Sequence, residues 1–193
     1  MALTYTSQYP PTQSGDYVKA TTTYQATNYD AWHTTNPAKS VTDAWLTNQW
    51  LSGSGVYVEQ RFHIDLGSAK IIRRIYYENS HNNGALTGRA CKNFTFWGSN
   101  TGAGTFDDLV YANDEGWTQL TISQSTLDEH VALNQADPKY IIVTNTVAYR
   151  YYAFKFADGW STTTYMGVRR IELQTEDGYG EATDNAIMFG MNF

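Results

Sequence analysis

The stretch Val58-Glu59-Gln60-Arg61-Phe62-His63-Ile64-Asp65-Leu66 decides the fold of this chain. Apolar side chains alternate in it with charged and polar ones, and the apolar set is Val58, Phe62, Ile64 and Leu66. Because successive side chains of a strand point to opposite faces, this alternation predicts a half-buried strand. Its apolar face packs on a core, and its charged residues face the other way.

Further β-rich runs follow along the chain, each bounded by Gly, Asn, Asp or Pro. They are Ile71 to Glu78, Asn93 to Ser99, Lys139 to Thr146, Tyr151 to Phe156 and Gly167 to Gln174. No segment keeps apolar residues at helical spacing for ten residues, so helices are expected to be short or absent. The pattern predicts an all-β, antiparallel chain folded as a sandwich, a jelly roll or a barrel.

The composition fits one β-rich domain with tails. The chain has 193 residues, of which 17% are charged and 15% aromatic, so its polarity comes from Thr, Asn, Ser, Gln and Gly rather than from helix-forming Glu and Lys. We expect a domain over residues 16–175, an N-terminal tail over 1–15 and a C-terminal tail over 176–193. The apolar end of that last tail, Ile187 to Phe193, either folds back on the domain or contacts a partner such as a second copy of the chain.

Charge and hydropathy exclude several partners. Thirteen Lys and Arg against 19 Asp and Glu give a net charge of −6, which disfavours nucleic acid and anionic lipid. The N-terminal residues do not resemble a signal peptide, and no run approaches the roughly 18 apolar residues of a membrane span. We expect an extracellular protein, or one on the surface of a particle, that is exported by means outside this chain. Cys91 is the single cysteine, so no internal disulfide forms.

Four groups of motifs, in order from about Ala20 to Gln174, resemble the discoidin (coagulation factor 5/8 type C) family. They are Pro37 to Asp43 running on to Thr47 to Trp50, then Phe62 to Gly67, then Lys92 to Asn100, and finally Arg150 to Lys155 with Arg169 to Leu173. The resemblance implies a galactose-binding-like jelly roll, an antiparallel β-sandwich with its chain ends close together and a ligand site in the loops at one end. Most microbial members of that family bind glycans, whereas some animal members bind lipid or protein.

Three loops carry the side chains that a sugar site needs, which are a flat ring beside hydrogen-bonding groups. The candidate carbohydrate-binding residues are Tyr29, Trp32 and His33 in the first loop, His81, Asn82, Asn83 and Arg89 in the second, and Asp158, Trp160 and Tyr165 in the third. Structural alternatives stand beside them. Trp32 or Trp160 could cap the core, His81 could be a solvated turn residue, and Arg89 could pair with an acid. Trp45 and Trp50 are interpreted as mainly structural.

One such site would bind weakly. A stacked ring contributes about 0.5–1.5 kcal/mol beyond burial, and a neutral hydrogen bond contributes a similar amount. A dissociation constant of about 1 mM corresponds to only about −4.1 kcal/mol. Useful adhesion therefore requires several copies, as in a homo-oligomer or a larger particle.

The resemblance also implies a structural calcium ion beneath the family's opening loop, here Pro37 to Trp50, held by main-chain carbonyls and acidic side chains. Asp43, Thr47 and Asn48 match the first half of that set. The acid expected in the closing strand falls at Arg170, with Glu172 two residues later on the same strand face. Two alternatives remain: Glu172 completes a calcium site, or Arg170 pairs with Asp43 in place of the metal.

Catalytic motifs are missing, so we expect a non-catalytic carbohydrate-binding module. Adjacent acidic pairs such as Asp107-Asp108 point to opposite faces in extended chain and do not suit glycoside hydrolysis. The least implausible enzyme is a polysaccharide lyase that uses His81, Arg89 and Tyr165. A second function class is a viral or phage attachment protein, in which the jelly roll serves as a tail or fibre adhesin on a host surface.

Overall fold

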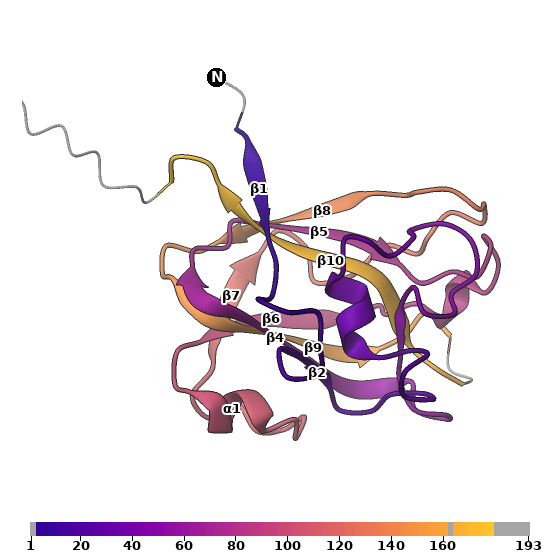
Figure 1. The fold of residues 1–193 in the computed structure, drawn as a ribbon, viewed down its shortest axis with the longest axis horizontal. Coiled ribbons are helices and arrows are strands. Elements are labelled where there is room, and N and C mark those ends of the chain that lie inside the picture. The colour runs from indigo at the N-terminus through magenta and orange to yellow at the C-terminus, as the bar shows by residue number, and fades with distance from the viewer. Residues whose placement is uncertain (1–2, 162–163, 180–193) are drawn as a thin grey trace, which may run out of the picture.

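The computed structural model describes residues 3–161 and 164–179 (Figure 1). Its strands are β1 (Tyr5–Gln8), β2 (Val18–Ala20), β3 (Trp50–Leu51), β4 (Val58–Lys70), β5 (Arg74–Asn79), β6 (Phe94–Ser99), β7 (Thr118–Ile122), β8 (Lys139–Thr144), β9 (Tyr149–Asp158) and β10 (Gly167–Glu176). The helices are η1 (Ala31–Thr35), η2 (Thr87–Arg89) and α1 (Ala103–Asp107). Within the described ranges, none of these helices is long and apolar enough to cross a membrane.

The strands form two antiparallel layers, which confirms the predicted β-sandwich (Figure 1). One layer contains β1, β3, β10, β5 and β8, and the other contains β2, β4, β9, β6 and β7. The layers join along one edge, where β7 pairs with β8 and Thr121 lies opposite Thr144. The sheet is therefore continuous on that side, and both of its inner faces contribute to one core.

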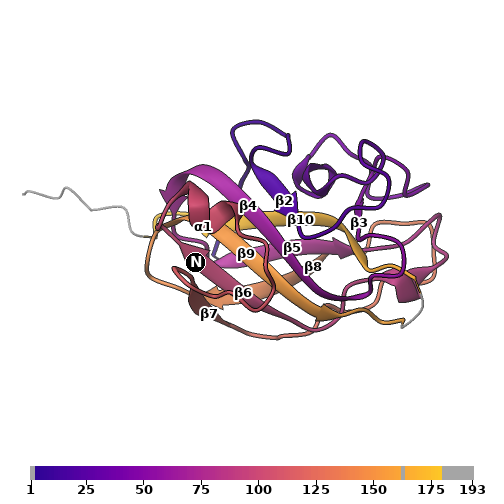
Figure 2. The ribbon, with the colours of Figure 1, turned by 90° about the horizontal axis from the view of Figure 1, so that it is seen from below.

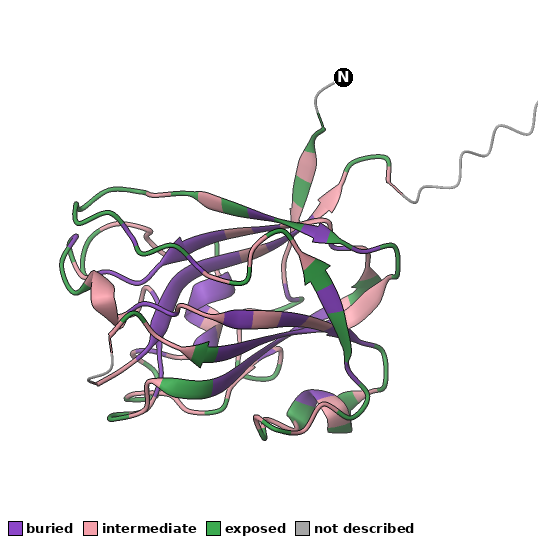
Figure 3. Ribbon diagram, turned by 180° about the vertical axis from the view of Figure 1, so that it is seen from behind, coloured by how far each residue is buried: buried purple, intermediate pink, exposed green. Residues whose placement is uncertain are grey.

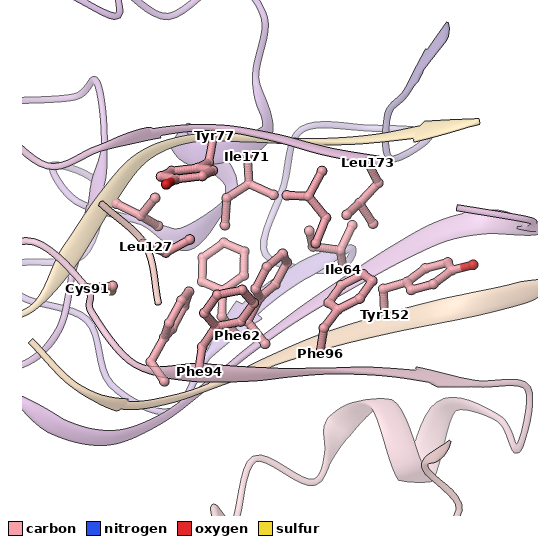
Figure 4. Close-up of a cluster of buried hydrophobic side chains, with 14 of the residues drawn as sticks. Phe62, Ile64, Tyr77, Cys91, Phe94, Phe96, Leu127, Tyr152, Ile171 and Leu173 are labelled. Atoms are coloured by element: carbon pink, nitrogen blue, oxygen red, sulfur yellow. The ribbon is translucent and has the colours of Figure 1, made fainter. Parts of the chain in front are cut away.

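The core between the layers is rich in aromatic rings (Figure 4). Phe62, Phe94 and Phe96 point from one layer toward Ile171 and Leu173 on β10 of the other, and all five are buried (Figure 4). Some ring pairs are tilted, such as Phe96 with Phe154, whose centroids are 4.8 Å apart, and others are stacked, such as Phe96 with Tyr152 at 5.4 Å. Figure 3 shows burial concentrated in the strands of the two layers.

The charged side of β4 faces away from this core, as predicted, but it is not exposed to solvent. Residues 100–117, which include α1, cover the outside of β4 and β9 (Figure 2). Nδ1 of His63 lies 2.8 Å from the carbonyl oxygen of Phe106, and the guanidinium of Arg61 lies 2.8 Å from the carboxylate of Asp114. The interpretation of Val58 as a core residue is wrong, because at the start of β4 it is 43% exposed.

Part of each predicted tail belongs to the sheet. β1 pairs along the end of β10, with Tyr5 opposite Glu176, and the backbone N–H of Asp177 donates to Thr4 at 3.0 Å. The two ends of the domain therefore lie together, as the family resemblance implies (Figure 1). The apolar stretch from Ile187 to Phe193 lies outside the described residues, so its contact with a partner stays a prediction.

Gly167 is required where β10 passes β3. A Cβ atom at Gly167 would lie 2.4 Å from the carbonyl oxygen of Trp50 and 2.5 Å from Cδ2 of Leu51. We expect Gly167→Ala to lower the free energy of unfolding by about 1–3 kcal/mol, because the backbone of a core strand must move. Urea denaturation measures this change, and Gly104→Ala, which meets nothing within 4 Å, is the control. Equal stability of Gly167→Ala and the wild type would contradict the prediction.

Candidate functional site

Several loops meet at the end of the sandwich that lies away from the chain ends (Figure 1). Five side chains from these loops contact one another in a closed ring, which we name the Arg89 cluster: Tyr24, Tyr29, Trp45, Arg89 and Tyr165. Centroid distances between neighbouring rings are 5.6 Å for Tyr24 and Tyr29, 6.2 Å for Tyr29 and Trp45, and 4.7 Å for Tyr24 and Tyr165.

Arg89 closes the ring from η2. Its Cζ lies 5.2 Å from the ring centroid of Trp45 and 5.4 Å from that of Tyr165, so the guanidinium is held by cation–π contacts. Its backbone is fixed by the hydrogen bond from its N–H to Leu86 and by the bridge between Ala90 and Gly167. The side chain of Arg89 forms no hydrogen bond or ion pair with residues 3–161 or 164–179. A guanidinium carries five N–H donors, and none of the described residues accepts a hydrogen bond from those of Arg89.

The rings around Arg89 differ in burial. Tyr29 is buried and packs edge to face against Trp45, so it supports the indole from the interior of the protein. Tyr24, Trp45 and Tyr165 are partly exposed. A side-chain hydrogen bond with Tyr165 is the main reason that the pKa of Tyr24 is raised. The cluster thus presents aromatic surface next to a hydrogen-bonding cation.

A hollow of about 280 Å³ opens beside Arg89, lined also by Leu86, Gly88 and Ser161. At about 30 Å³ per water molecule, it holds the volume of about nine waters, which is the scale of one sugar ring. Leu46 and Leu86, exposed by 48% and 44%, add apolar surface nearby. The site therefore combines a hollow, flat rings and donors, as sugar recognition requires.

His81, the second-loop histidine, lies in the interior. Its Nε2 donates to the carbonyl oxygen of Val41 at 3.0 Å, and its Nδ1 accepts from the N–H of Gly84 at 3.0 Å. The imidazole stacks on His130 with centroids 3.9 Å apart, and burial lowers the pKa of His81 to about 4. Both nitrogens are thus occupied in a neutral ring that holds the opening loop.

Asn82 and Asn83 also hold the opening loop. The side-chain oxygen of Asn82 accepts from the N–H of Trp45 at 3.2 Å. The backbone N–H of Asn83, whose φ is 50°, donates to Asp43 at 3.0 Å. Asn82 therefore positions Trp45, and neither Asn82 nor Asn83 belongs to the Arg89 cluster.

Trp32 and His33 lie in η1, which packs against β10 and β2. His33 is 1% exposed, and burial lowers its pKa to about 4. Trp32 packs on the core, lies 5.3 Å from the Nζ of Lys39, and lines a different hollow of about 270 Å³ with Asp30 and Lys19. These two candidates therefore do not converge with Arg89.

Asp158 and Trp160 are held by internal hydrogen bonds. The carboxylate of Asp158 accepts from the backbone and side-chain N–H groups of Asn93 at 3.0 and 2.9 Å. Nε1 of Trp160 donates to Leu127 at 3.0 Å, while Lys92 lies over the indole at 4.6 Å. Trp160 is still 37% exposed and lies on the chain next to Ser161 of the hollow.

Of the predicted sugar-binding residues, the structure therefore brings together Tyr29, Arg89 and Tyr165. Sequence reasoning missed Tyr24 and interpreted Trp45 as structural. The sequence contains a signal for Trp45, since an apolar Trp45-Leu46 pair in a polar loop is typical of an exposed contact surface. Tyr24 is embedded in a Thr-rich stretch and had no comparable signal.

The predicted calcium ligands do not come together. Asn48 donates to Ala44 at 2.9 Å and accepts from Ser40 at 3.2 Å within the opening loop, where Thr47 also lies. Glu172 lies elsewhere, accepting from the hydroxyl of Ser7 at 2.6 Å. The described part of the chain contains no group of three or more His, Cys, Asp or Glu side chains that could hold a metal ion. These residues do not fit the calcium site that the resemblance implies.

The other alternative, a pairing of Arg170 with Asp43, is not what the structure shows. Arg170 lies 3.3 Å from Glu172 and donates to the carbonyl of Lys39. The neighbouring Arg169 reaches Asp43 instead, through its main-chain oxygen at 2.9 Å. The physical reason is a β-bulge between Val168 and Arg170, which shifts the register of β10 and re-aims its side chains.

Solved structures share the fold. A family 32 carbohydrate-binding module of NanJ from C. perfringens, in complex with galactose, has a TM-score of 0.56 and 14% identity, covering 89% of this chain and all (100%) of that one. An F5/8 type C domain from Bacteroides fragilis has a TM-score of 0.55 at 11% identity, covering 82% and 90%. Chitosan-binding module 1 of a chitosanase/glucanase from Paenibacillus sp. IK-5 has 0.50 at 17%, covering 81% and 92%.

The TM-scores establish the discoidin-like, carbohydrate-binding-module fold, and sequence identities this low leave the ligand open. No curated protein matches the sequence. The profile of one family, DUF5000, described as a domain of unknown function, matches residues 36–174. That match spans the opening loop, both layers of the sandwich and most of β10, so the chain is a member of the DUF5000 family with a discoidin-like fold.

Proposed function

We propose that this protein is a non-catalytic carbohydrate-binding domain that takes a glycan at the Arg89 cluster. The observation that supports this function is the guanidinium of Arg89. It lies between the rings of Trp45 and Tyr165 and has no hydrogen-bond or ion-pair partner among the described residues. A cation without a hydrogen-bond partner, fixed beside flat rings at the rim of a hollow, is a recognition site for hydroxyl or carboxylate oxygens of a sugar.

The geometry suits the two kinds of surface on a sugar ring. Its C–H face packs on the indole of Trp45 or the ring of Tyr165, while Arg89 donates to oxygens at the ring edge. Each stacked ring contributes about 0.5–1.5 kcal/mol beyond burial, so one site binds weakly, with a dissociation constant near 1 mM at about −4.1 kcal/mol. Function therefore requires several copies on one surface, as an oligomer or on a larger extracellular assembly.

Two of the similar solved structures are a module in complex with galactose and a chitosan-binding module, which supports the ligand class but not a particular sugar. Non-catalysis is supported by the position of His81. A lyase that used His81, Arg89 and Tyr165 would need a free imidazole nitrogen, and both nitrogens of His81 are hydrogen-bonded inside the opening loop.

A glycan array followed by titration of the best ligand tests the proposal. We expect Arg89→Ala and Trp45→Ala to weaken binding at least about tenfold, since each removes about 1.4 kcal/mol or more of contact. The matched control is Arg74→Ala, because Arg74 is also held between two rings, Tyr5 at 3.8 Å and Tyr140 at 4.5 Å, but on the outer face of the sheet.

The control variant should bind like the wild type. If no glycan binds, or if Arg89→Ala and Arg74→Ala bind equally well, the Arg89 cluster is not the site. A release of reducing ends or unsaturated sugars during incubation with polysaccharides would contradict the absence of catalysis.

A further inference from the structure

Four main-chain carbonyl oxygens converge on one buried side chain, Arg169. The first guanidinium nitrogen donates to Ser40 at 3.2 Å and to Thr42, and the second donates to Asp43 at 2.9 Å and to His81 at 2.8 Å. We name these four oxygens the carbonyl cage. The two terminal nitrogens of a guanidinium carry four N–H donors, so each carbonyl of the cage receives one.

The geometry of β10 directs the side chain of Arg169 into the carbonyl cage. The β-bulge between Val168 and Arg170 turns the side chain of Arg169 toward the opening loop and leaves it 0% exposed. The side chain of His81 contacts the same loop through its hydrogen bond to Val41 at 3.0 Å. Two consecutive arginines therefore bind the main chain of the opening loop, Arg169 through the carbonyl cage and Arg170 through the carbonyl oxygen of Lys39.

A set of converging carbonyl oxygens in a loop is the ligand chemistry of a hard cation such as calcium. In this chain a positive charge already lies in the cage. Burial lowers the pKa of Arg169 to about 10, which leaves the group protonated at neutral pH, and the charges of Asp43 and Glu78 oppose that decrease.

We propose that the guanidinium of Arg169 is a built-in cation that replaces calcium in the opening loop, so that the fold is independent of metal. The loop it holds also carries Trp45 of the Arg89 cluster. If the proposed glycan site is correct, its affinity is therefore independent of calcium as well, and this second consequence alone rests on that function.

The first experiment compares the wild-type protein in excess calcium, in chelator and in plain buffer. We expect the same melting temperature in all three, and no heat of calcium binding in calorimetry. A lower melting temperature after chelation, or a stoichiometric calcium signal, would overturn the proposal. These readouts need no glycan, so they separate failure of this inference from failure of the glycan site.

The second experiment removes the cation. Arg169→Met keeps an unbranched apolar stem but removes the guanidinium and its four hydrogen bonds, so the amides of residues 40–48 should exchange with solvent at least about tenfold faster. Arg61→Met is the matched control, because Arg61 is also 0% exposed and holds a different loop through Asn113 and Asp114. It should accelerate exchange in residues 110–114 and leave residues 40–48 protected.

Arg169→Lys provides the test if the methionine variant does not fold. Lysine keeps the charge but has three donors on one atom, so it leaves the cage partly unsatisfied. We expect exchange of residues 40–48 between that of the wild type and that of a variant without the cation. Unchanged exchange of these amides in both variants would show that Arg169 does not hold the loop.

Discussion

Replacing Trp50 with alanine is expected to lower the free energy of unfolding by about 3–5 kcal/mol, the cost of an unfilled cavity in a packed core. Trp50 is 0% exposed and lies between the layers, with its ring centroid 5.4 Å from that of Phe62 and 6.0 Å from that of Phe156. Its Nε1 donates to the carbonyl of Thr22 at 2.9 Å, so the variant also leaves a polar group unpaired.

Urea denaturation followed by near-ultraviolet circular dichroism measures this loss. Trp160→Ala is the control, because Trp160 is 37% exposed and its removal opens no enclosed cavity. It should cost about 1 kcal/mol, chiefly for the lost hydrogen bond to Leu127. Similar stability of the two variants would contradict the placement of Trp50 at the centre of the sandwich.

The second large effect is loss of stability in mild acid. All four histidines are buried, and three of them have exposed fractions of 1% or less: His33 at 1%, His63 at 0% and His81 at 0%. Burial lowers the pKa of each of these three to about 4, while that of an unfolded histidine is about 6.5. The unfolded chain therefore binds protons in a pH range where the folded chain does not.

The direction follows from linkage. Above about pH 6.5 these histidines are neutral in both states, so their contribution to stability is complete. As the pH falls from about 6.5 toward about 4, protonation favours the unfolded state, and stability decreases by about 2 kcal/mol for each histidine at pH 4.5. A total of several kcal/mol is large against an ordinary stability of about 5–15 kcal/mol.

Unfolding by urea at pH 7.0 and at pH 4.5 tests this expectation. His63→Asn removes one titrating group while keeping an N–H where Nδ1 of His63 meets Phe106, so it should reduce the pH dependence by about one third. NMR titration of the imidazole protons gives the folded pKa values directly. Stability that is constant between these pH values would show that the three rings are not shielded from water.

Much of the fold could be predicted because the long strands carry local patterns. Alternation marks β4, and dense apolar runs mark β5, β6, β9 and β10. The short strands β1, β2 and β7 were not predicted because each of them has polar residues at exposed or partly exposed positions, and β3 was not predicted because its two residues, Trp50 and Leu51, are too few to form a pattern. Their pairing, such as Tyr5 with Glu176, joins residues that are far apart in the sequence. No local propensity encodes a partner of that kind.

The candidate site was predictable as a class of residues in three loops and not as a set of contacts. Arg89 and Tyr165 were identified from their chemistry, and they do meet. The side chains of His81 and Asp158 could equally hydrogen-bond to a sugar, yet both form hydrogen bonds inside the protein instead. Only the packing of the loops shows which donors have partners and which remain available to a ligand.

The sequence by itself determined the fold class, through the alternation from Val58 to Leu66 and the order of its motifs, because core-facing periodicity is a local property. The tertiary structure decided what the charged face of that strand does and which groups form the site. Arg61 and His63 look like solvent-facing residues until the loop around Phe106 covers them, and Asp65 looks solvent-facing until Arg150 pairs with it. Arg169 likewise becomes the cation of the opening loop because of the β-bulge in β10. The bulge shifts the register of the strand by one residue, so Arg169 contacts the main chain of Asp43, where the sequence predicted Arg170.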